Sequence, residues 1–317
     1  MTDIERAAAI LRGGGLVAFP TETVYGLGAD ASNPAALTRL YEVKGRPHSH
    51  PLIVHLPSAA HLSRWVRGVP EAARSLAQVF WPGPLTLVME RASGVHDLVT
   101  GGQSTVAVRV PNHPLALELL ASFGGGLAAP SANRFGRLSP TTAEHVRHDL
   151  GTDVDMVLDG GPCAVGVEST IVDLSAAVPR VLRPGGITVE QLAQVLGERP
   201  ELTHRGGPRV PGTLPSHYAP ATRTVLVSDA ADYLKSRRLA AGVLAARPKP
   251  GNVDVGHWIE LPAEPASYGH RLYAALRYLD RAGVEIIVVE VVPDRPEWLA
   301  VRDRLERAAG PPDDAGA

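Results

Sequence analysis

Four clusters of polar side chains could carry chemistry, and each stands at the end of an expected strand or in the loop after it. The first is Thr21-Glu22-Thr23, within the stretch PTETVYGLG. Two hydroxyls and a carboxylate beside a strand suit recognition of a small zwitterion. Threonine hydroxyls can equally cap an ordinary turn between a strand and a loop. This cluster alone does not decide between the two interpretations.

The second cluster is KGRP at residues 44–47, followed by His50 and His55. Two cations held around a tight turn by glycine and proline form a clamp for a polyphosphate. A Lys and an Arg at the end of a helix can also complement the helix dipole. No core role is expected for Lys44 or Arg46, and this cluster alone does not decide between the clamp and the helix end.

The third cluster centres on Arg109 in the expected strand TVAVRVP. Side chains alternate between the two faces of a strand, so Arg109 lies on the face opposite Val106, Val108 and Val110. We therefore expect Arg109 to point into a cleft rather than into the apolar core.

The fourth cluster is PSAN at residues 130–133, with EST at 168–170 and RPGG at 183–186 further along the chain. Taken singly, each of the four clusters is more typical of a structural turn. Together they supply several cations and hydroxyls with no competing chemistry. The hypothesis of a binding site rests on their combination.

Several familiar sites are excluded. The sequence contains no GxxxxGK[ST] phosphate loop, no HExxH, no GxSxG and no kinase signature. Residues 26–31 fit GxGxx[GA], but the dinucleotide motif needs a helix that opens at the glycines and an acidic residue about 20 positions later. Here the helix is expected to open near Asn33, and the later positions read Lys-Gly-Arg. We reject the dinucleotide interpretation.

Two further features have simple structural explanations. His145 and His148 stand three residues apart beside Asp149 and could hold a metal, although a solvated helix face is the preferred interpretation. Cys163 is the single cysteine, which excludes an internal disulfide and a cysteine zinc cluster. We interpret it as a small buried filler.

The composition predicts a packed protein of about two domains. Of 317 residues, 44% are hydrophobic and 20% are charged, and the formal net charge is −2. This balance argues against strong non-specific binding of nucleic acid. There is no signal peptide pattern and no apolar run near the ~20 residues that a membrane span requires. We expect a cytoplasmic protein.

Local patterns predict the elements that position the clusters. A first helix places Ile4, Ala7, Ala8 and Leu11 on one side, and a second begins after Asn33, with Gly45 ending it. Strands are expected at GLVAFP, PLIVHL, LTLVME, TVAVRVP, GLAAPS, MVLDGG and STIVDLS, whereas residues 21–31 read as a turn-forming stretch. The pattern predicts an α/β or α+β domain with a mixed sheet over residues 1–200.

A second domain is expected after a Gly- and Pro-rich linker at residues 201–220. Residues 221–310 alternate Val- and Ile-rich runs with helical patterns, including a helix at about 268–282, which predicts a small parallel sheet covered by helices. The tail at 311–317 is expected to be disordered.

The motifs also resemble a known family. In order along the chain, PTETVYGLG, KGRP with PLIVH, WPGPLTLV, AVRVP, APSAN, and ESTIVD with LRPG resemble the Sua5/YrdC threonylcarbamoyl-AMP synthases. The resemblance covers about Ile10 to Thr188 densely, and PGTLPSHYAP resembles the linker of the long, two-domain Sua5 form. It implies a YrdC-like mixed twisted sheet with helices, plus a small Rossmann-like parallel α/β C-terminal domain.

The resemblance assigns roles to particular residues. The family's KxR and SxN pairs stand here as the catalytic, nucleotide-site residues Lys44, Arg46, Ser131 and Asn133. The implied threonine pocket consists of Thr23, His55, Arg109, Ala129 and Ser169. The implied ATP contacts are Arg46, His50, Thr105, Ser131, Ser139, Arg183 and, from the linker, Tyr218. In two departures, His50 stands where many relatives carry Asn, and the linker lacks the Met-Lys that often precedes HYAP.

The implied reaction joins L-threonine, bicarbonate and ATP into threonylcarbamoyl-AMP, for the N6-threonylcarbamoyladenosine modification of tRNA. Mg²⁺ would accompany the triphosphate, held mainly by phosphates and water rather than by protein ligands. A threonylcarbamoyl-transferase complex acting on tRNA is the implied downstream partner. Two alternatives stay open: a carbamoyltransferase-like domain, and a non-catalytic module that binds double-stranded RNA or tRNA.

The segment from Arg205 to Pro220 is expected to act as a lid as well as a tether. It has no periodic apolar face, so we expect it not to pack as an element. Gly206, Gly207 and Gly212 offer hinges, and the Tyr218 ring is suited to covering a nucleotide. A passive linker is the alternative.

Overall fold

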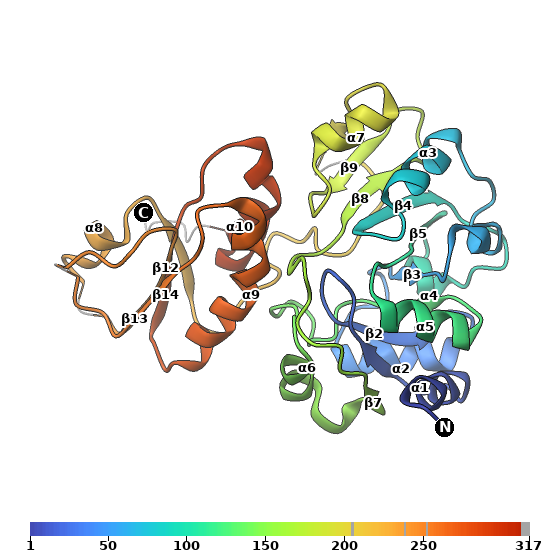
Figure 1. The fold of residues 1–317 in the computed structure, drawn as a ribbon, viewed down its shortest axis with the longest axis horizontal. Coiled ribbons are helices and arrows are strands. Elements are labelled where there is room, and N and C mark those ends of the chain that lie inside the picture. Colours follow the sequence, from blue (N-terminus) through green and yellow to red (C-terminus); the bar gives the residue numbers. More distant parts are fainter. Residues whose placement is uncertain (204–205, 238, 252, 312–317) are drawn as a thin grey trace. The chain divides into compact units, whose positions relative to one another are not determined.

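The computed structural model describes residues 1–203, 206–237, 239–251 and 253–311. The chain forms two compact units (Figure 1). The N-terminal unit consists of Met1–Phe135, Ser139–Ala164 and Glu168–Thr213, and the C-terminal unit consists of Gly136–Leu138, Val165–Val167 and Leu214–Ala317. Arg205 and the expected disordered tail beyond Pro311 lie outside the described residues.

The N-terminal unit is built on a mixed sheet, as its sequence predicts, and this sheet has ten strands. Its strands are Val17–Phe19 (β1), Gly26–Asp30 (β2), Ile53–His55 (β3), Leu85–Glu90 (β4), Thr105–Arg109 (β5), Leu127–Ala128 (β6), Met156–Val157 (β7), Thr170–Asp173 (β8), Arg180–Arg183 (β9) and Glu201–Leu202 (β10). Their order is β10-β9-β8-β4-β5-β3-β6-β2-β1-β7. The pair β3 and β5 is parallel, whereas β4 pairs with β5 in the antiparallel sense.

The strand β2 corrects the expected turn at residues 21–31. Gly26–Asp30 pairs with β1 in the antiparallel sense, with Phe19 opposite Gly26. A Cβ at Gly28 would lie 2.9 Å from a ring carbon of Phe19, so the glycines make room for the Phe19 ring beside the hairpin. The turn prediction is wrong because these glycines serve close packing in a strand. The helix that a dinucleotide motif requires does not open at these glycines, because residues 26–30 form β2 and α2 begins at Pro34.

Helices cover this sheet, and the first two of them stand where the sequence signals place them. They are Asp3–Arg12 (α1), Pro34–Lys44 (α2), Glu71–Phe80 (α3), Asp97–Thr100 (α4), Pro114–Phe123 (α5), Ala143–Leu150 (α6) and Val189–Leu196 (α7), with 3-10 turns Ala59–Arg64 (η1) and Gly151–Asp153 (η2). The apolar side predicted for α1 is buried with α5 and β1 in one core cluster. Asn33 caps α2 and Gly45 ends it with φ 61°, as predicted.

The C-terminal unit contains a four-stranded parallel sheet, which confirms its predicted class. Its elements are Thr224–Val227 (β11), Ala230–Leu234 (α8), Ala241–Ala245 (β12), His257–Glu260 (β13), Pro265–Arg281 (α9), Ile286–Glu290 (β14), Pro296–Trp298 (η3) and Leu299–Ala309 (α10). The strand order is β11-β14-β12-β13, and every pairing is parallel. Helix α9 begins earlier than predicted, because the Glu264 side chain accepts the amide hydrogens of its first turn.

The linker packs more than its composition predicts. Val210 is 5% exposed and belongs to a core cluster with Ile53, Ala107 and other residues of the N-terminal unit. From Leu214 onward the chain belongs to the C-terminal unit, where Arg307 donates to the Leu214 carbonyl. The expectation of an unpacked segment is therefore wrong. Isolated apolar residues between glycines and prolines can be buried without any periodicity.

Candidate functional site

The loop that carries the SxN motif is attached to the end of helix α2 by a buried lysine. Lys44 Nζ donates to the backbone carbonyls of Ser131, at 2.6 Å, and Asn133, at 2.5 Å. Gly45, in the left-handed conformation, turns the chain away directly after Lys44. Lys44 is 2% exposed, and burial, with a smaller effect from Arg46, holds its pKa well below the ordinary value. The structure thus joins the KxR and SxN motifs, and it corrects the expectation that Lys44 has no core role.

The SxN loop is also fixed from the other side by strand β2. Leu27 donates its amide hydrogen to the Pro130 carbonyl, and Ala132 donates to the Tyr25 carbonyl. These bonds extend the pairing of β2 past the end of β6. The backbone of the loop is therefore rigidly positioned beside the first polar cluster.

Arg46 lies in a region that gathers positive charge. Its Nη2 donates to the Pro51 carbonyl at 2.7 Å, and its guanidinium lies 5.5 Å from the Phe135 ring centre. The His50 imidazole packs edge-on against the same ring. Burial lowers the pKa of His50, and the charges of Arg46 and Arg209 lower it further. Arg209 belongs to the linker, in the last stretch of the N-terminal unit's sequence. This region therefore brings the charge of that stretch close to the KGRP turn.

Arg109 lies in a buried polar group at the end of β5. Its Nη1 donates to Thr23 Oγ1 at 2.9 Å, and its Nε donates to the Gly83 carbonyl at 3.2 Å. Its Nη2 lies 2.8 Å from Glu22 Oε1, and both side chains are more than nine-tenths buried. Arg109 was predicted to point into a cleft rather than into the apolar core; it is 4% exposed, and its side-chain contacts are with these polar groups.

His55 stands beside Arg109 because β3 and β5 are parallel and in register at these residues. Burial, and then the charge of Arg109, lowers the pKa of His55 to about 3. The imidazole is therefore neutral at physiological pH. Ala129 is held next to β3 by donating its amide hydrogen to the Ile53 carbonyl. Thr23, His55, Arg109 and Ala129 are thus brought together by neighbouring strands.

Ser169 and Arg183 form a second buried polar group. Arg183 Nη2 donates to the carbonyl and the hydroxyl oxygen of Ser169, at 2.9 and 3.1 Å. Arg183 Nη1 donates to the Pro211 carbonyl of the linker at 3.0 Å. The Ser169 hydroxyl also contacts the Thr86 hydroxyl at 2.8 Å. One arginine thereby connects the EST motif, strand β9 and the linker.

Three further predicted ATP residues have contacts of their own. Thr105 begins β5, four residues before Arg109, which corresponds to roughly 13 Å along a strand. Ser139 Oγ donates to Glu168 Oε1 at 2.5 Å, and both are buried. Tyr218 belongs to the C-terminal unit, where it is 2% exposed and lies 5.1 Å from the Arg304 guanidinium.

The linker packs on the face of the sheet to which Thr105 and Arg109 belong. Because faces alternate along a strand, Thr105, Ala107 and Arg109 share a face of β5. Ala107 belongs to the cluster that contains Val210. Arg209, next to Val210, exchanges backbone hydrogen bonds with the Gln103 side chain just before β5. Residues 206–213 thus run over the face that carries the predicted site.

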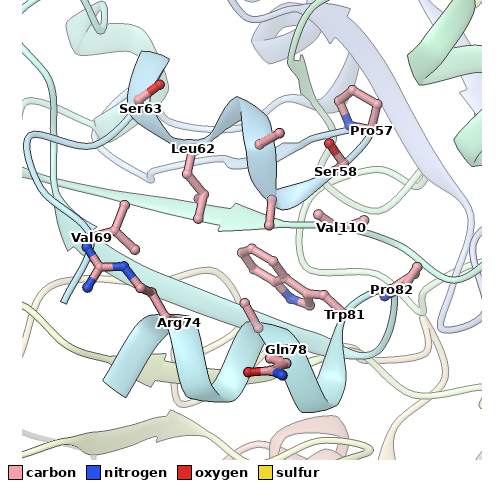
Figure 2. Close-up of a pocket in the computed structure, with 13 residues that line it drawn as sticks. Pro57, Ser58, Leu62, Ser63, Val69, Arg74, Gln78, Trp81, Pro82 and Val110 are labelled. Atoms are coloured by element: carbon pink, nitrogen blue, oxygen red, sulfur yellow. The ribbon is translucent and has the colours of Figure 1, made fainter. Parts of the chain in front are cut away.

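A separate cavity of about 550 Å³ lies between η1 and α3, and Figure 2 shows its lining. Trp81, Leu62, Val69 and Val110 give it a largely apolar wall, with Arg74 at its edge. None of the residues predicted for substrate or nucleotide lines it. The size of this cavity therefore does not identify it as the reaction site.

His145, His148 and Cys163 lie outside these groups, and each is explained by contacts or packing with neighbouring residues. His148 Nδ1 lies 3.2 Å from its neighbour Asp149, and His145 Nδ1 contacts Thr141. Across the residues that the structure describes, no three His, Cys, Asp or Glu side chains gather as a metal site. Burial raises the pKa of Cys163 to about 12, which suits an inert packed thiol. No helix of the described ranges combines the length and the hydropathy of a membrane span.

Comparisons with known proteins agree with this architecture. A family model described as "Telomere recombination", of the Sua5, YciO and YrdC proteins, matches residues 9–185. The C-terminal domain of threonylcarbamoyl-AMP synthase matches residues 187–310. The chain belongs to the Sua5/YrdC family, in its two-domain form.

Full-length relatives support the same conclusion. The chain is 40% identical to the threonylcarbamoyl-AMP synthase of Pyrococcus abyssi, covering 97% of this chain and 94% of the relative. It is 41% identical to the enzyme of that name from Bacillus subtilis, covering 97% and 93%. The crystal structure of P. abyssi Sua5 complexed with L-threonine aligns with a TM-score of 0.90 at 38% identity, over 96% of this chain and 94% of that one.

Two residues of these groups were not assigned a role from sequence. Glu22 was noted in the first cluster, but its pairing with Arg109 depends on the order of strands. Arg209 was considered only as part of a flexible segment. The apolar residue Val210, next to Arg209 in the sequence, is the signal that could have indicated a fixed position for Arg209.

Proposed function

We propose that this chain is a threonylcarbamoyl-AMP synthase, a nucleotidyltransferase that joins L-threonine, bicarbonate and ATP. The observation that carries the proposal is the Lys44 contact that unites the KxR and SxN motifs, in a chain whose full-length relatives bear that name. The buried groups around Arg109 and Arg46 supply separate positions for a carboxylate and for phosphates. No described group resembles a catalytic triad, and the proposed chemistry needs none.

The reaction proceeds in two stages. The threonine amine attacks bicarbonate, or carbon dioxide derived from it, and forms an N-carboxylate with loss of water. That carboxylate attacks the α-phosphorus of ATP, a new P–O bond forms, and pyrophosphate leaves. Catalysis then consists of positioning the reactants and neutralising their charge.

Each polar group has a defined part in this scheme. Arg109 holds the threonine carboxylate, because a guanidinium matches a carboxylate in planar geometry. The neutral His55 and Thr23 surround the amino acid without adding charge. Arg46 and Arg183 stabilise the charge of the phosphates, and Lys44 holds the SxN loop in place.

Ser169 and Ala129 complete the threonine pocket in this proposal. His50, Thr105, Ser131 and Ser139 are the further nucleotide contacts, with Asn133 in the same loop as Ser131. Tyr218 remains a proposed nucleotide contact from the C-terminal unit. These assignments follow the family motifs residue by residue.

Mg²⁺ is proposed to enter with ATP. The groups around the nucleotide residues are mostly cationic side chains, hydroxyls and backbone carbonyls. Phosphates and water would therefore provide most of the ligands of Mg²⁺. When bound, the ion neutralises charge on the triphosphate. The product would pass to a transferase that modifies tRNA, and a cytoplasmic setting fits a protein with a single, buried cysteine.

Pyrophosphate release tests the proposal. The purified chain should release pyrophosphate from ATP when both L-threonine and bicarbonate are present, and hardly at all when either is omitted. Carbamoyltransferase chemistry would instead require carbamoyl phosphate. A non-catalytic RNA-binding module would bind tRNA and release no pyrophosphate under any of these conditions.

A further inference from the structure

Glu22 presents a buried carboxylate whose bonding is incomplete. The residue is 7% exposed, and Oε1 lies 2.8 Å from Arg109 Nη2. That contact is an ion pair rather than an aligned hydrogen bond, and within the described residues neither Glu22 oxygen has a hydrogen-bond partner. A buried carboxylate without hydrogen bonds is costly, so such an arrangement needs an explanation.

Other buried polar atoms near Glu22 also lack a hydrogen-bond partner among the described residues. His55 Nδ1 and His113 Nδ1 are buried, and neither has a hydrogen-bond partner in the part of the chain that is described. His113 and Cys163 are the further titratable groups whose electrostatics involve Glu22, besides Arg109. Neither supplies a positive charge to the carboxylate when His113 is neutral. Beyond the Arg109 ion pair, the missing partner is therefore a hydrogen-bond donor, preferably a cation, that the described residues do not provide.

The Glu22–Arg109 pair has the charge pattern that complements an α-amino acid. Arg109 is already aligned by Thr23 and Gly83, which leaves guanidinium hydrogens for a further acceptor. An α-amino acid carries its ammonium and carboxylate on one carbon, so the two charges lie as close together as those of the pair. A zwitterion placed antiparallel to the pair satisfies both residues at once.

We propose that Glu22 receives the α-ammonium group of the amino-acid substrate while Arg109 receives its carboxylate, so that Glu22 selects amino acids over hydroxy acids. This rests on the proposed function, which makes L-threonine the substrate. The same nitrogen must reach the carbon dioxide unit, and it becomes the nucleophile once the ammonium has given a proton to the Glu22 carboxylate or to water. Glu22 therefore also fixes the direction of the nucleophile. Charge-assisted hydrogen bonds of this kind are about twice as strong as neutral ones.

A structural role for Glu22, in which it only orients Arg109, predicts different behaviour. Its loss would then weaken binding of every carboxylate ligand equally, whether or not the ligand carries an amine. The discriminating quantity is therefore the ratio of two dissociation constants. The matched ligands are L-threonine and (2S,3R)-2,3-dihydroxybutanoate, in which a hydroxyl replaces the amine.

The experiment is calorimetric titration of the full chain with both ligands. The wild type should bind L-threonine at least about tenfold more tightly than the hydroxy acid, and Glu22→Gln should reduce that ratio about tenfold or more. Glu22→Asp keeps the charge and should keep most of the preference at lower affinity. Glu118→Gln, on the exposed surface of α5, is the matched control and should change neither constant.

The outcomes separate this inference from the proposed function. Threonine binding by the wild type with an unchanged ratio in Glu22→Gln would overturn the role of Glu22 alone. Failure of the wild type to bind L-threonine would overturn the proposed function and this inference with it. If Glu22→Gln does not fold, equal affinity of the wild type for the two ligands would still refute the selection of an amine.

Discussion

Lys44 Nζ donates to the carbonyl oxygens of Ser131 and Asn133, which lie almost ninety positions later in the chain. The last residue of α2 therefore holds the loop that follows β6. A lysine in this position acts through the backbone of the SxN loop, in addition to any contribution of its charge to phosphate binding. This arrangement makes the shape of the nucleotide site depend on one buried side chain.

Replacing Lys44 with Met should lower both stability and activity. Methionine fills similar space but leaves two buried carbonyls without their donor, which costs about 1–3 kcal/mol each when no water replaces it. Urea unfolding should show a lower midpoint for Lys44→Met, and pyrophosphate release should fall by more than tenfold. Lys249→Met, at an exposed lysine of the C-terminal unit, is the matched control. An unchanged midpoint would show that the loop does not depend on Lys44.

Arg109→Lys should raise the KM for threonine far more than the KM for ATP. Lysine keeps the charge but cannot make the planar contacts that Arg109 makes with Thr23, Gly83 and a carboxylate. We expect an increase of about tenfold or more in the threonine KM. Steady-state kinetics with each substrate varied in turn measures the two effects. A larger change in the ATP KM would place Arg109 at the nucleotide instead.

Signals from neighbouring residues predicted many of the helices and strands. They could not predict which strands pair with each other across the sheet. The cap at Asn33 and the stop at Gly45 are read from neighbouring residues, because a helix end is decided within one turn. Strand β2 was missed since its glycines resemble a turn until Phe19 is known to lie opposite. Local composition cannot reveal that a bulky ring from the preceding strand needs that space.

The same distinction holds for the candidate site. Motif order was enough to propose Arg46, Arg109 and Ser131 as site residues, since the motifs keep their spacing along the chain. The pairing of Arg109 with Glu22 depends on where the loop after β1 meets the end of β5, which is a property of sheet order. The burial of Val210 in the sheet cluster is likewise a tertiary property.

His55 should make the folded chain sensitive to acid. Its pKa is about 3 in the folded state against 6.5 ordinarily, so the unfolded state binds more protons between these values. The contribution of His55 is therefore fully present above pH 6.5 and is lost as pH falls toward 3, by up to about 4–5 kcal/mol. Stability of His55→Gln should decline less steeply over this range than that of the wild type. His61→Gln, at an exposed histidine, should follow the wild type, and parallel curves for all three would contradict the assignment.

Cleavage after Arg209 should report closure of the segment at residues 206–213 over the nucleotide. Arg209 is exposed, whereas its neighbour Val210 is buried on the sheet face that carries Arg109, and Arg183 holds the Pro211 carbonyl. A nucleotide that engages Arg183 and the region near His50 should therefore strengthen the attachment of this segment. Limited trypsin digestion should slow after Arg209 when ATP and L-threonine are both present, while cleavage after the exposed Arg67 should continue at its original rate. Val210→Ala removes about 1–2 kcal/mol of buried apolar contact and should speed cleavage at Arg209 without ligands. Equal rates at Arg209 with and without ligands would show that the segment is only a tether.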